Sequence, residues 1–144
     1  MTRGLVATAT VTVDAPPDRV WEALTDPRLI AQYMFGSRVE SDWTVGSPIT
    51  YSGEYEGKPY QDRGEILEIR TGQLLRTTHF SPLSGVPDVP ENYHTIEYSL
   101  TPKGSTTVLT LSQDNNSSEA ESQHSAANWQ QMLDALKRVA EELG

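Results

Sequence analysis

Residues 118–143 predict a long amphipathic helix; they read SEAESQHSAANWQQMLDALKRVAEEL. The apolar residues recur three or four positions apart, which places them on one helix face. The main members of this face are Trp129, Leu133, Leu136, Ala140 and Leu143. Ser118 and Glu121 fit a capping box, in which each side chain accepts a hydrogen bond from the other residue's backbone N–H. We therefore expect a capped helix with one apolar face.

The apolar face of this helix is bulky in its C-terminal half and small in its N-terminal half. At 100° per residue, Ser122, Ser125 and Ala126 lie on the same side as Trp129 and Leu133. Small side chains that face a concave sheet leave volume unfilled unless another element or a ligand occupies it. We expect a cavity beside Ser122, Ser125 and Trp129. In the alternative, the short helices or a long loop fill that space.

The residues before this helix predict mainly β-strands. Strands are expected over residues 5–13, 37–41, 48–55, 60–69, 73–80, 92–100 and 106–113. Two short helices are expected after the first strand, where Pro17 and Pro27 suit first-turn positions and Asp26 suits an N-cap. Short links between consecutive strands favour hairpins and an antiparallel sheet. The exception is residues 81–91, a link with three prolines that is either a lid or a permissive surface insertion.

These elements predict an α+β fold in a single domain over residues 1–144. A curved antiparallel sheet of about seven strands would wrap around the long C-terminal helix, with the two short helices on the same side. Strand alternation places Leu67 and Ile69 on one face, and it points other side chains toward the helix. The predicted lining of a ligand-binding cavity is Trp129, Ser125, Ser122, Tyr51, His79, Tyr98 and Gln113.

Composition and charge exclude several classes of function. The chain has 20 acidic and 11 basic residues, a net charge of −9, so phosphate backbones would repel it and no nucleic-acid partner is expected. The absence of cysteine excludes disulfides and thiolate chemistry. No apolar stretch approaches the roughly 20 residues that span a bilayer, and the N-terminal sequence lacks a signal-peptide core. We expect a cytoplasmic protein without a membrane span.

The sequence predicts no catalytic set, no metal site and no cofactor. The histidines, His79, His94 and His124, match no metal-binding motif, and no G-x-S-x-G nucleophile motif occurs. His124 is expected to face solvent. His79 could hydrogen-bond a ligand or act as a base if it points into the cavity. In the other interpretation, it is an ordinary strand histidine with its hydrogen bonds satisfied.

Residues 13–24, VDAPPDRVWEAL, resemble the opening of the START/Bet v 1-like (SRPBCC) helix-grip domains. The chain is most similar to the branch named after the activator of Hsp90 ATPase. Further matching pieces follow in the same order: Val45-Gly46, residues 64–69 (GEILEI), 107–111 (TVLTL) and 128–136 (NWQQMLDAL). The resemblance implies a seven-stranded sheet that grips the last helix and encloses a deep cavity. Relatives bind lipids, polyketides, hormones or other apolar ligands, and some are cyclases or hydratases.

Three functions are compatible with these patterns. The leading hypothesis is the binding of a small hydrophobic or amphipathic molecule between the sheet and the C-terminal helix. The second is an enzyme of the polyketide cyclase or hydratase type, with His79 or a tyrosine as acid or base. The third is a protein-interaction domain, such as an Hsp90-type co-chaperone, whose acidic surface attracts a basic partner. A homodimer also stays open.

Overall fold

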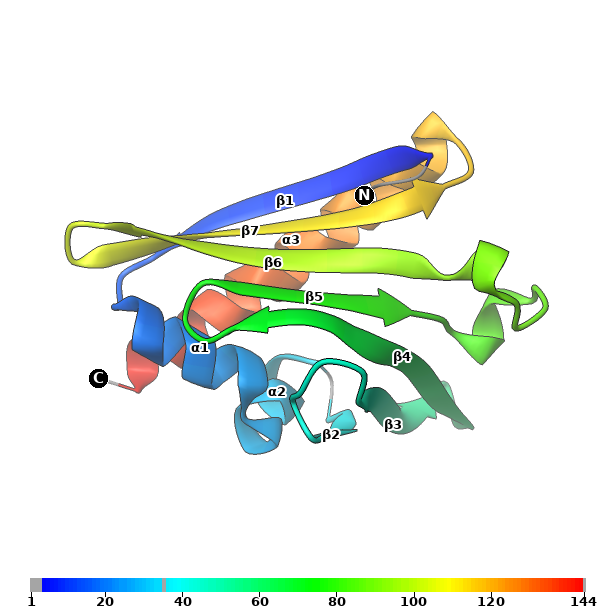
Figure 1. The fold of residues 1–144 in the computed structure, drawn as a ribbon, viewed down its shortest axis with the longest axis horizontal. Coiled ribbons are helices and arrows are strands. Elements are labelled where there is room, and N and C mark those ends of the chain that lie inside the picture. The colour runs from blue at the N-terminus through cyan, green and yellow to red at the C-terminus, as the bar shows by residue number, and fades with distance from the viewer. Residues whose placement is uncertain (1–3, 35, 144) are drawn as a thin grey trace.

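The computed structural model describes residues 4–34 and 36–143, apart from the side chains at positions 55 and 83. It has the α+β fold that the sequence predicts (Figure 1). The elements are β1 (Leu5–Val13), α1 (Pro17–Thr25), α2 (Pro27–Tyr33), β2 (Arg38–Ser41), β3 (Pro48–Tyr55), β4 (Lys58–Arg70), β5 (Leu74–His79), β6 (His94–Lys103), β7 (Thr106–Asn116) and α3 (Glu119–Glu142). Two short 3-10 helices, Pro82–Ser84 and Pro90–Asn92, lie between β5 and β6.

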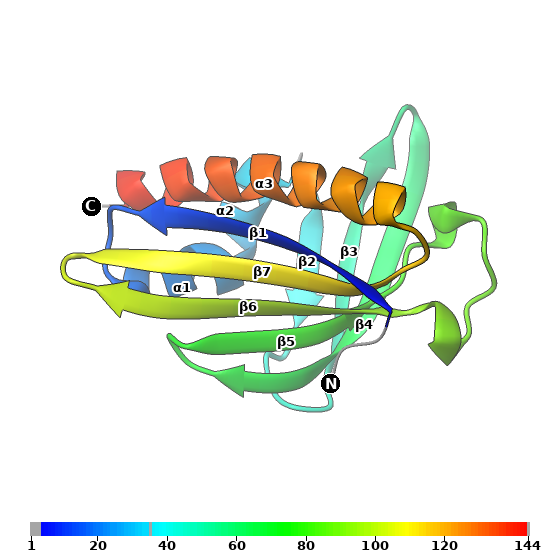
Figure 2. The same ribbon diagram turned by 90° about the horizontal axis from the view of Figure 1, so that it is seen from above.

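In the described part of the chain, seven strands form one antiparallel sheet in the order β1-β7-β6-β5-β4-β3-β2. Strands β2 to β7 follow one another as hairpins, and β1 pairs with β7 at the edge. Figure 2 shows α3 running across one face of the curved sheet, and no helix of the described residues covers the other face. This arrangement is the helix-grip fold that the sequence predicts.

Two strands, β6 and β7, extend beyond the ends that the hydrophobic pattern predicts. β6 ends at Lys103 rather than at residue 100, because Lys103 still pairs with Thr106 across the turn. β7 continues to Asn116 rather than ending at residue 113, because Leu5 of β1 pairs with Asn116. Polar residues can extend a ladder when their backbones keep a partner, so hydrophobic alternation understates strand length.

The helix N-termini follow the predicted chemistry with one difference. Asp26 accepts a hydrogen bond from the Arg28 N–H at 2.9 Å, and Ser118 accepts one from the Glu121 N–H at 3.1 Å. The Glu121 carboxylate accepts a hydrogen bond from the Ser117 hydroxyl instead of from the Ser118 backbone. The predicted reciprocal capping box is therefore only half formed.

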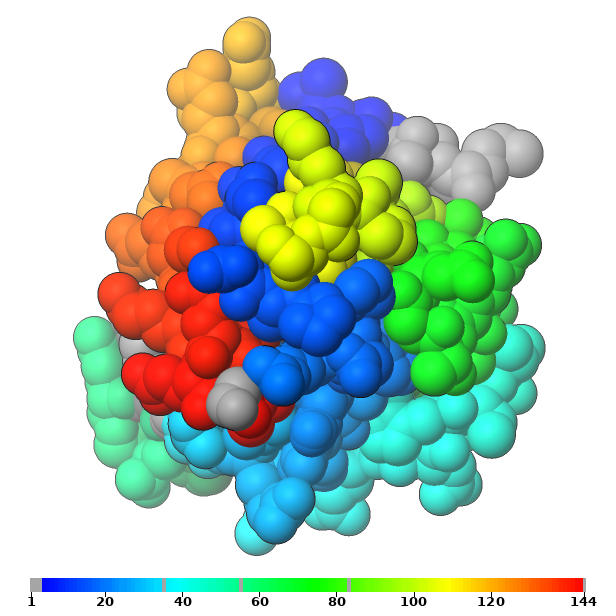
Figure 3. Space-filling view, turned by 90° about the vertical axis from the view of Figure 1, so that its left-hand side faces the viewer, coloured from blue at the N-terminus to red at the C-terminus, as the bar shows by residue number. Residues whose placement is uncertain are grey.

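Packed side chains fill the space beside the C-terminal half of α3. Leu133 and Leu136 are fully buried there, together with Val20 of α1. Figure 3 views this end, where α1 lies between the last turns of α3 and the strand hairpins. α1 thus fills the space beside the bulky half of α3. The cavity between α3 and the sheet lies beside the small half.

The expected orientation of Leu67 is wrong, because a β-bulge in β4 turns its side chain outward. Ile66 pairs with Thr77 while Glu68 pairs with Arg76, so β4 has one extra residue at this point. Ile66 is completely buried and Leu67 is 38% exposed. A bulge shifts the alternation by one residue, which is why Leu67 does not share the inner face with the partly buried Ile69.

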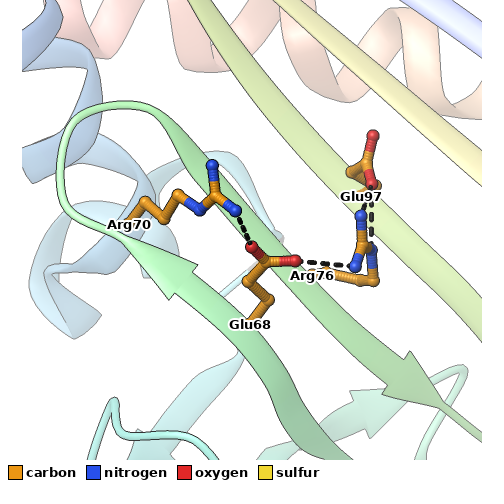
Figure 4. Close-up of polar contacts among 4 residues, drawn as sticks. All are labelled: Glu68, Arg70, Arg76 and Glu97. Atoms are coloured by element: carbon orange, nitrogen blue, oxygen red, sulfur yellow. Dashed lines mark hydrogen bonds and ion pairs between the residues drawn. The ribbon is translucent and has the colours of Figure 1, made fainter.

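The outer face of the sheet carries a network of ion pairs (Figure 4). Arg76 on β5 lies between two carboxylates, with its guanidinium 2.7 Å from Glu68 and 2.6 Å from Glu97. Arg70 pairs with Glu68 at 2.7 Å. Because these residues come from β4, β5 and β6, the network ties three neighbouring strands together on the face opposite α3.

Candidate functional site

A cavity of about 340 Å³ lies between the N-terminal half of α3 and the inner face of the sheet. Its volume falls within the range of small-molecule sites, roughly 300–1,000 Å³. Aromatic and apolar side chains form most of the wall. The lining residues are Tyr33, Met34, Ser37, Tyr51, Tyr60, Asp62, His79, Ile96, Tyr98, Gln113, Ser125, Asn128, Trp129 and Met132.

Six of the seven residues predicted from the sequence line this cavity, and Ser122 does not. The Ser122 hydroxyl donates a hydrogen bond to the backbone carbonyl of Val6 in β1 at 3.1 Å. Ser122 shares a helix face with Trp129, but its short side chain lies against the β1 edge and is occupied by this hydrogen bond.

The sequence prediction missed Asp62 and Tyr60, which β4 places on the inner face. The turn between β3 and β4 is Glu56-Gly57, with φ of 51° and 80° at the two positions. Positive φ at both central residues is typical of the tight two-residue turn that matches strand twist. Counting outward from this turn pairs Tyr51 with Asp62. The register was therefore available from the turn, although the polar β4 sequence gives no hydrophobic pattern to indicate it.

Asp62 and His79 form a polar pair at one end of the cavity. Asp62 Oδ2 lies 3.0 Å from His79 Nε2, and both side chains are about four-fifths buried. The Tyr51 ring stands edge-on to the His79 ring, with centroids 5.9 Å apart. Asp62 Oδ1 is buried and has no hydrogen-bond partner among the described residues. The pair thus leaves one carboxylate oxygen unsatisfied.

A glycine lets β4 and β5 come together beside this pair. A Cβ at Gly64 would lie 1.8 Å from the backbone oxygen of Thr78, closer than any side chain can approach. The Thr78 hydroxyl accepts a hydrogen bond from the Glu65 N–H at 2.9 Å, which replaces a regular ladder bond. Only glycine fits at this close approach. The position of Asp62 relative to His79 depends on it.

Three tyrosines in the wall, of which Tyr33 and Tyr98 are buried and Tyr51 is half-buried, keep their phenolic protons. Burial raises the pKa of Tyr33, Tyr51 and Tyr98 above the ordinary value, and the nearby Asp62 charge raises the pKa of Tyr51 further. The Tyr33 hydroxyl donates to the Ala23 carbonyl at 2.8 Å. These groups are neutral hydrogen-bonding partners near pH 7, and they add no charge to the cavity wall.

Trp129 and Gln113 separate the cavity from an outer hollow. The Trp129 indole N–H donates to the Gln113 side-chain oxygen, and both residues border a second hollow of about 470 Å³. His79 also borders both spaces. The hydrogen-bonded pair therefore forms part of a wall between the inner cavity and the space beneath the β5–β6 connection.

The β5–β6 connection is anchored at its base. Asp88 accepts a hydrogen bond from the Tyr93 hydroxyl at 2.6 Å and pairs with Arg63 of β4 at 3.2 Å. The Tyr93 ring stacks on Phe80, with centroids 5.1 Å apart. These contacts hold both ends of the connection against the sheet, while Val86 in its middle is 46% exposed.

The described residues form neither a metal cluster nor a membrane-spanning helix. Among them, no group of three or more His, Cys, Asp or Glu side chains is arranged to hold a metal ion. None of the helices formed by these residues is long and apolar enough to cross a membrane. His124 is exposed on α3, as the sequence predicts.

Comparison with known proteins agrees with the fold. A model of the family described as activator of Hsp90 ATPase homolog 1-like protein matches residues 14–141. The solution structure of ChR145 from Cytophaga hutchinsonii is similar over 99% of this chain and 97% of that chain, with a TM-score of 0.85 and 45% identity. A search of the curated proteins found no match.

Two more distant structures share the fold. The crystal structure of CalU16 from Micromonospora echinospora has a TM-score of 0.72 and 22% identity, over 97% of this chain and 86% of that chain. The solution structure of the Aha1 dimer from Colwellia psychrerythraea has a TM-score of 0.72 and 16% identity, over 95% of this chain and 96% of that chain. At these identities the similarity concerns the fold alone.

Proposed function

Because the chain belongs to the activator of Hsp90 ATPase homolog 1-like family, and a cavity lies between its sheet and α3, we propose that it binds a small hydrophobic or amphipathic molecule there. The ligand would lie between the N-terminal half of α3 and strands β3 to β7. Trp129, Ser125 and Tyr51 would contact its apolar body. His79, Gln113 and Tyr98 would supply hydrogen-bonding groups.

The observation that carries this proposal is the composition of the cavity wall. Apolar and aromatic side chains such as Met132, Ile96 and Trp129 alternate with a few polar groups. Binding sites for small molecules typically combine an apolar wall with a small number of placed polar groups. Tyrosine and tryptophan offer flat apolar area with a polar edge, which suits an amphipathic ligand.

A bulky substitution on α3 tests the location. Ser125→Phe places a ring in the cavity, whereas Ala127→Phe places the same ring on the exposed side of α3. With octanol as the probe, isothermal titration calorimetry should show at least a roughly tenfold loss of affinity for Ser125→Phe, about 1.4 kcal/mol. Ala127→Phe should stay within about twofold of the unchanged protein. Equal octanol affinity in both variants would place the ligand elsewhere.

The Asp62–His79 pair favours a second candidate function, an enzyme of the cyclase or hydratase kind. A carboxylate that hydrogen-bonds one ring nitrogen orients a histidine, and the other nitrogen can then exchange a proton with a substrate. This function predicts turnover of a polyketide-like substrate that falls by about 10²-fold or more in His79→Gln. Undiminished turnover in His79→Gln would remove that residue from the mechanism.

A further inference from the structure

The charge of the inner cavity points to a more specific ligand. We propose that the molecule bound in this cavity carries a positively charged amine, which binds at the end formed by Asp62 and the surrounding tyrosine rings. This inference rests on the proposed function, since it names the chemical class of the ligand in the same cavity. The rest of the ligand would be an apolar body against Met132, Ile96 and Trp129.

The first argument is the sign of the charge in the wall. Among the described lining residues, Asp62 is the only carboxylate, there is no lysine or arginine, and the one basic side chain is His79, which contacts Asp62 Oδ2. Arg63, the next residue in β4, is half exposed and pairs with Asp88 outside the cavity. The whole chain has a net charge of −9. A cation in this space is therefore attracted by the nearby Asp62 carboxylate and by the net negative charge of the whole chain, whereas an anion is repelled.

The second argument is the unsatisfied oxygen of Asp62. Its Oδ2 contacts His79, while its Oδ1 is buried without a hydrogen-bond partner in the described structure. A buried polar atom without a partner destabilises the folded state, and a charged one does so more strongly. An ammonium group has three donors and no acceptor. A ligand amine beside Asp62 would supply both the missing donor and the compensating charge.

The third argument is the aromatic surface around this end. Tyr51 is the strand partner of Asp62, and Tyr60 lies two residues before Asp62 on the same inner face of β4. Tyr98 and Trp129 complete an aromatic wall. A cation near the face of such rings is attracted by the ring electrons, and more strongly in a desolvated site. Burial keeps the Tyr51 phenol neutral, so the ring acts through its face and its hydroxyl.

Three probes of equal chain length separate charge from apolar burial. Octylamine, octanol and octanoate should be titrated into the folded protein at one ionic strength. Octylamine should bind at least about tenfold more tightly than octanol, because ion pairing and cation–π contact together exceed 1.4 kcal/mol. Octanoate should bind most weakly of the three. This comparison needs no variant, so it does not depend on the folding of an altered chain.

Two variants then assign the preference to Asp62. Asp62→Asn should lower octylamine affinity at least about tenfold and leave octanol within about twofold of the unchanged protein. Glu65→Gln is the matched control, because it removes one negative charge from an exposed position on the same strand. The affinity of Glu65→Gln for octylamine should stay within about twofold of that of the unchanged protein.

The outcomes separate this inference from the proposed function. Equal affinity for octylamine and octanol would overturn the amine proposal and leave the cavity as a site for neutral apolar ligands. An equal loss of octylamine affinity in Asp62→Asn and Glu65→Gln would also overturn it, since overall charge would then explain the preference. Failure of all three probes to bind would contradict the proposed function itself.

Discussion

Gln130 in α3 forms hydrogen bonds with both backbone groups of Thr10 in β1. Its side-chain oxygen accepts from the Thr10 N–H at 3.4 Å, and its side-chain nitrogen donates to the Thr10 carbonyl at 3.0 Å. β1 lies at the edge of the sheet, where a strand presents unpaired backbone groups. The Gln130 amide thus takes the place of the strand that β1 lacks.

The same relationship continues along α3. The Lys137 ammonium donates to the Thr12 carbonyl at 2.9 Å, and the Glu141 carboxylate accepts from the Asp14 N–H at 2.8 Å. Exposed strand edges can pair with another chain and lead to aggregation. α3 therefore performs two tasks: it packs over the concave face of the sheet, and its polar side chains cover the β1 edge.

Replacing Gln130 should weaken this edge. Gln130→Ala leaves the Thr10 N–H and carbonyl without their partners, so the free energy of unfolding should fall by about 1–2 kcal/mol. Gln131→Ala is the matched control, because Gln131 is the neighbouring, exposed residue. It should change the free energy by less than about 0.5 kcal/mol. Urea denaturation followed by circular dichroism measures both, and equal changes would contradict the edge-covering role.

The contribution of Glu141 should depend on pH. The Lys137 ammonium and then the Asp14 N–H lower the pKa of Glu141 in the folded protein. A lowered folded-state pKa means that the stabilisation is present above the unfolded pKa, about 4.3, and is lost as pH falls through the folded value. Glu141→Gln should therefore be less stable than the unchanged protein at pH 7, by up to about 1 kcal/mol because the pair is partly exposed.

Below about pH 4 the difference between Glu141→Gln and the unchanged protein should shrink toward zero. Urea denaturation at pH 7 and pH 3.5 measures this change. Glu142→Gln, at the next and exposed position, provides the control and should show no such trend. A Glu141→Gln difference that is the same at both pH values would show that the carboxylate charge does not contribute.

The outer-face network should be sensitive to salt. Arg76 contacts Glu68 and Glu97, and these contacts raise the pKa of Arg76 (Figure 4). Arg76→Gln should lower the free energy of unfolding by about 1 kcal/mol at low ionic strength, and by less at 1 M NaCl. Arg38→Gln removes an arginine whose pair with Glu40 is long and exposed, at 3.7 Å, and should have almost no effect. Equal changes in the free energy of unfolding for Arg76→Gln and Arg38→Gln would contradict a stabilising role of the network.

Much of the fold and the cavity position could be predicted from particular residues. The spacing of Trp129, Leu133 and Leu136 defines the helix face, and the change from bulky to small residues along it gives the end at which the cavity lies. Strand alternation was sufficient to place Tyr51, His79 and Tyr98 on the face of the sheet that lines the cavity. Ser122 lies outside the cavity lining, because helical periodicity gives a direction along the helix face but not how α3 lies relative to the edge of β1.

Asp62 shows what sequence periodicity does not reveal. The β4 residues around it are mostly polar, so no apolar alternation indicates which side faces inward. Its role follows from the register of the β3–β4 hairpin and from the close approach at Gly64, and both depend on backbone geometry. Likewise, the exposure of Leu67 depends on a bulge that the sequence pattern does not mark.

Native mass spectrometry of the purified protein tests the central claim most directly. The protein should be measured as purified and after addition of octylamine, beside Ser125→Phe, and then again after denaturing extraction. The cavity proposal predicts an added non-covalent mass that denaturation removes and that Ser125→Phe does not retain. An added mass retained equally by Ser125→Phe would contradict binding in this cavity, and so would a bare polypeptide mass under every condition.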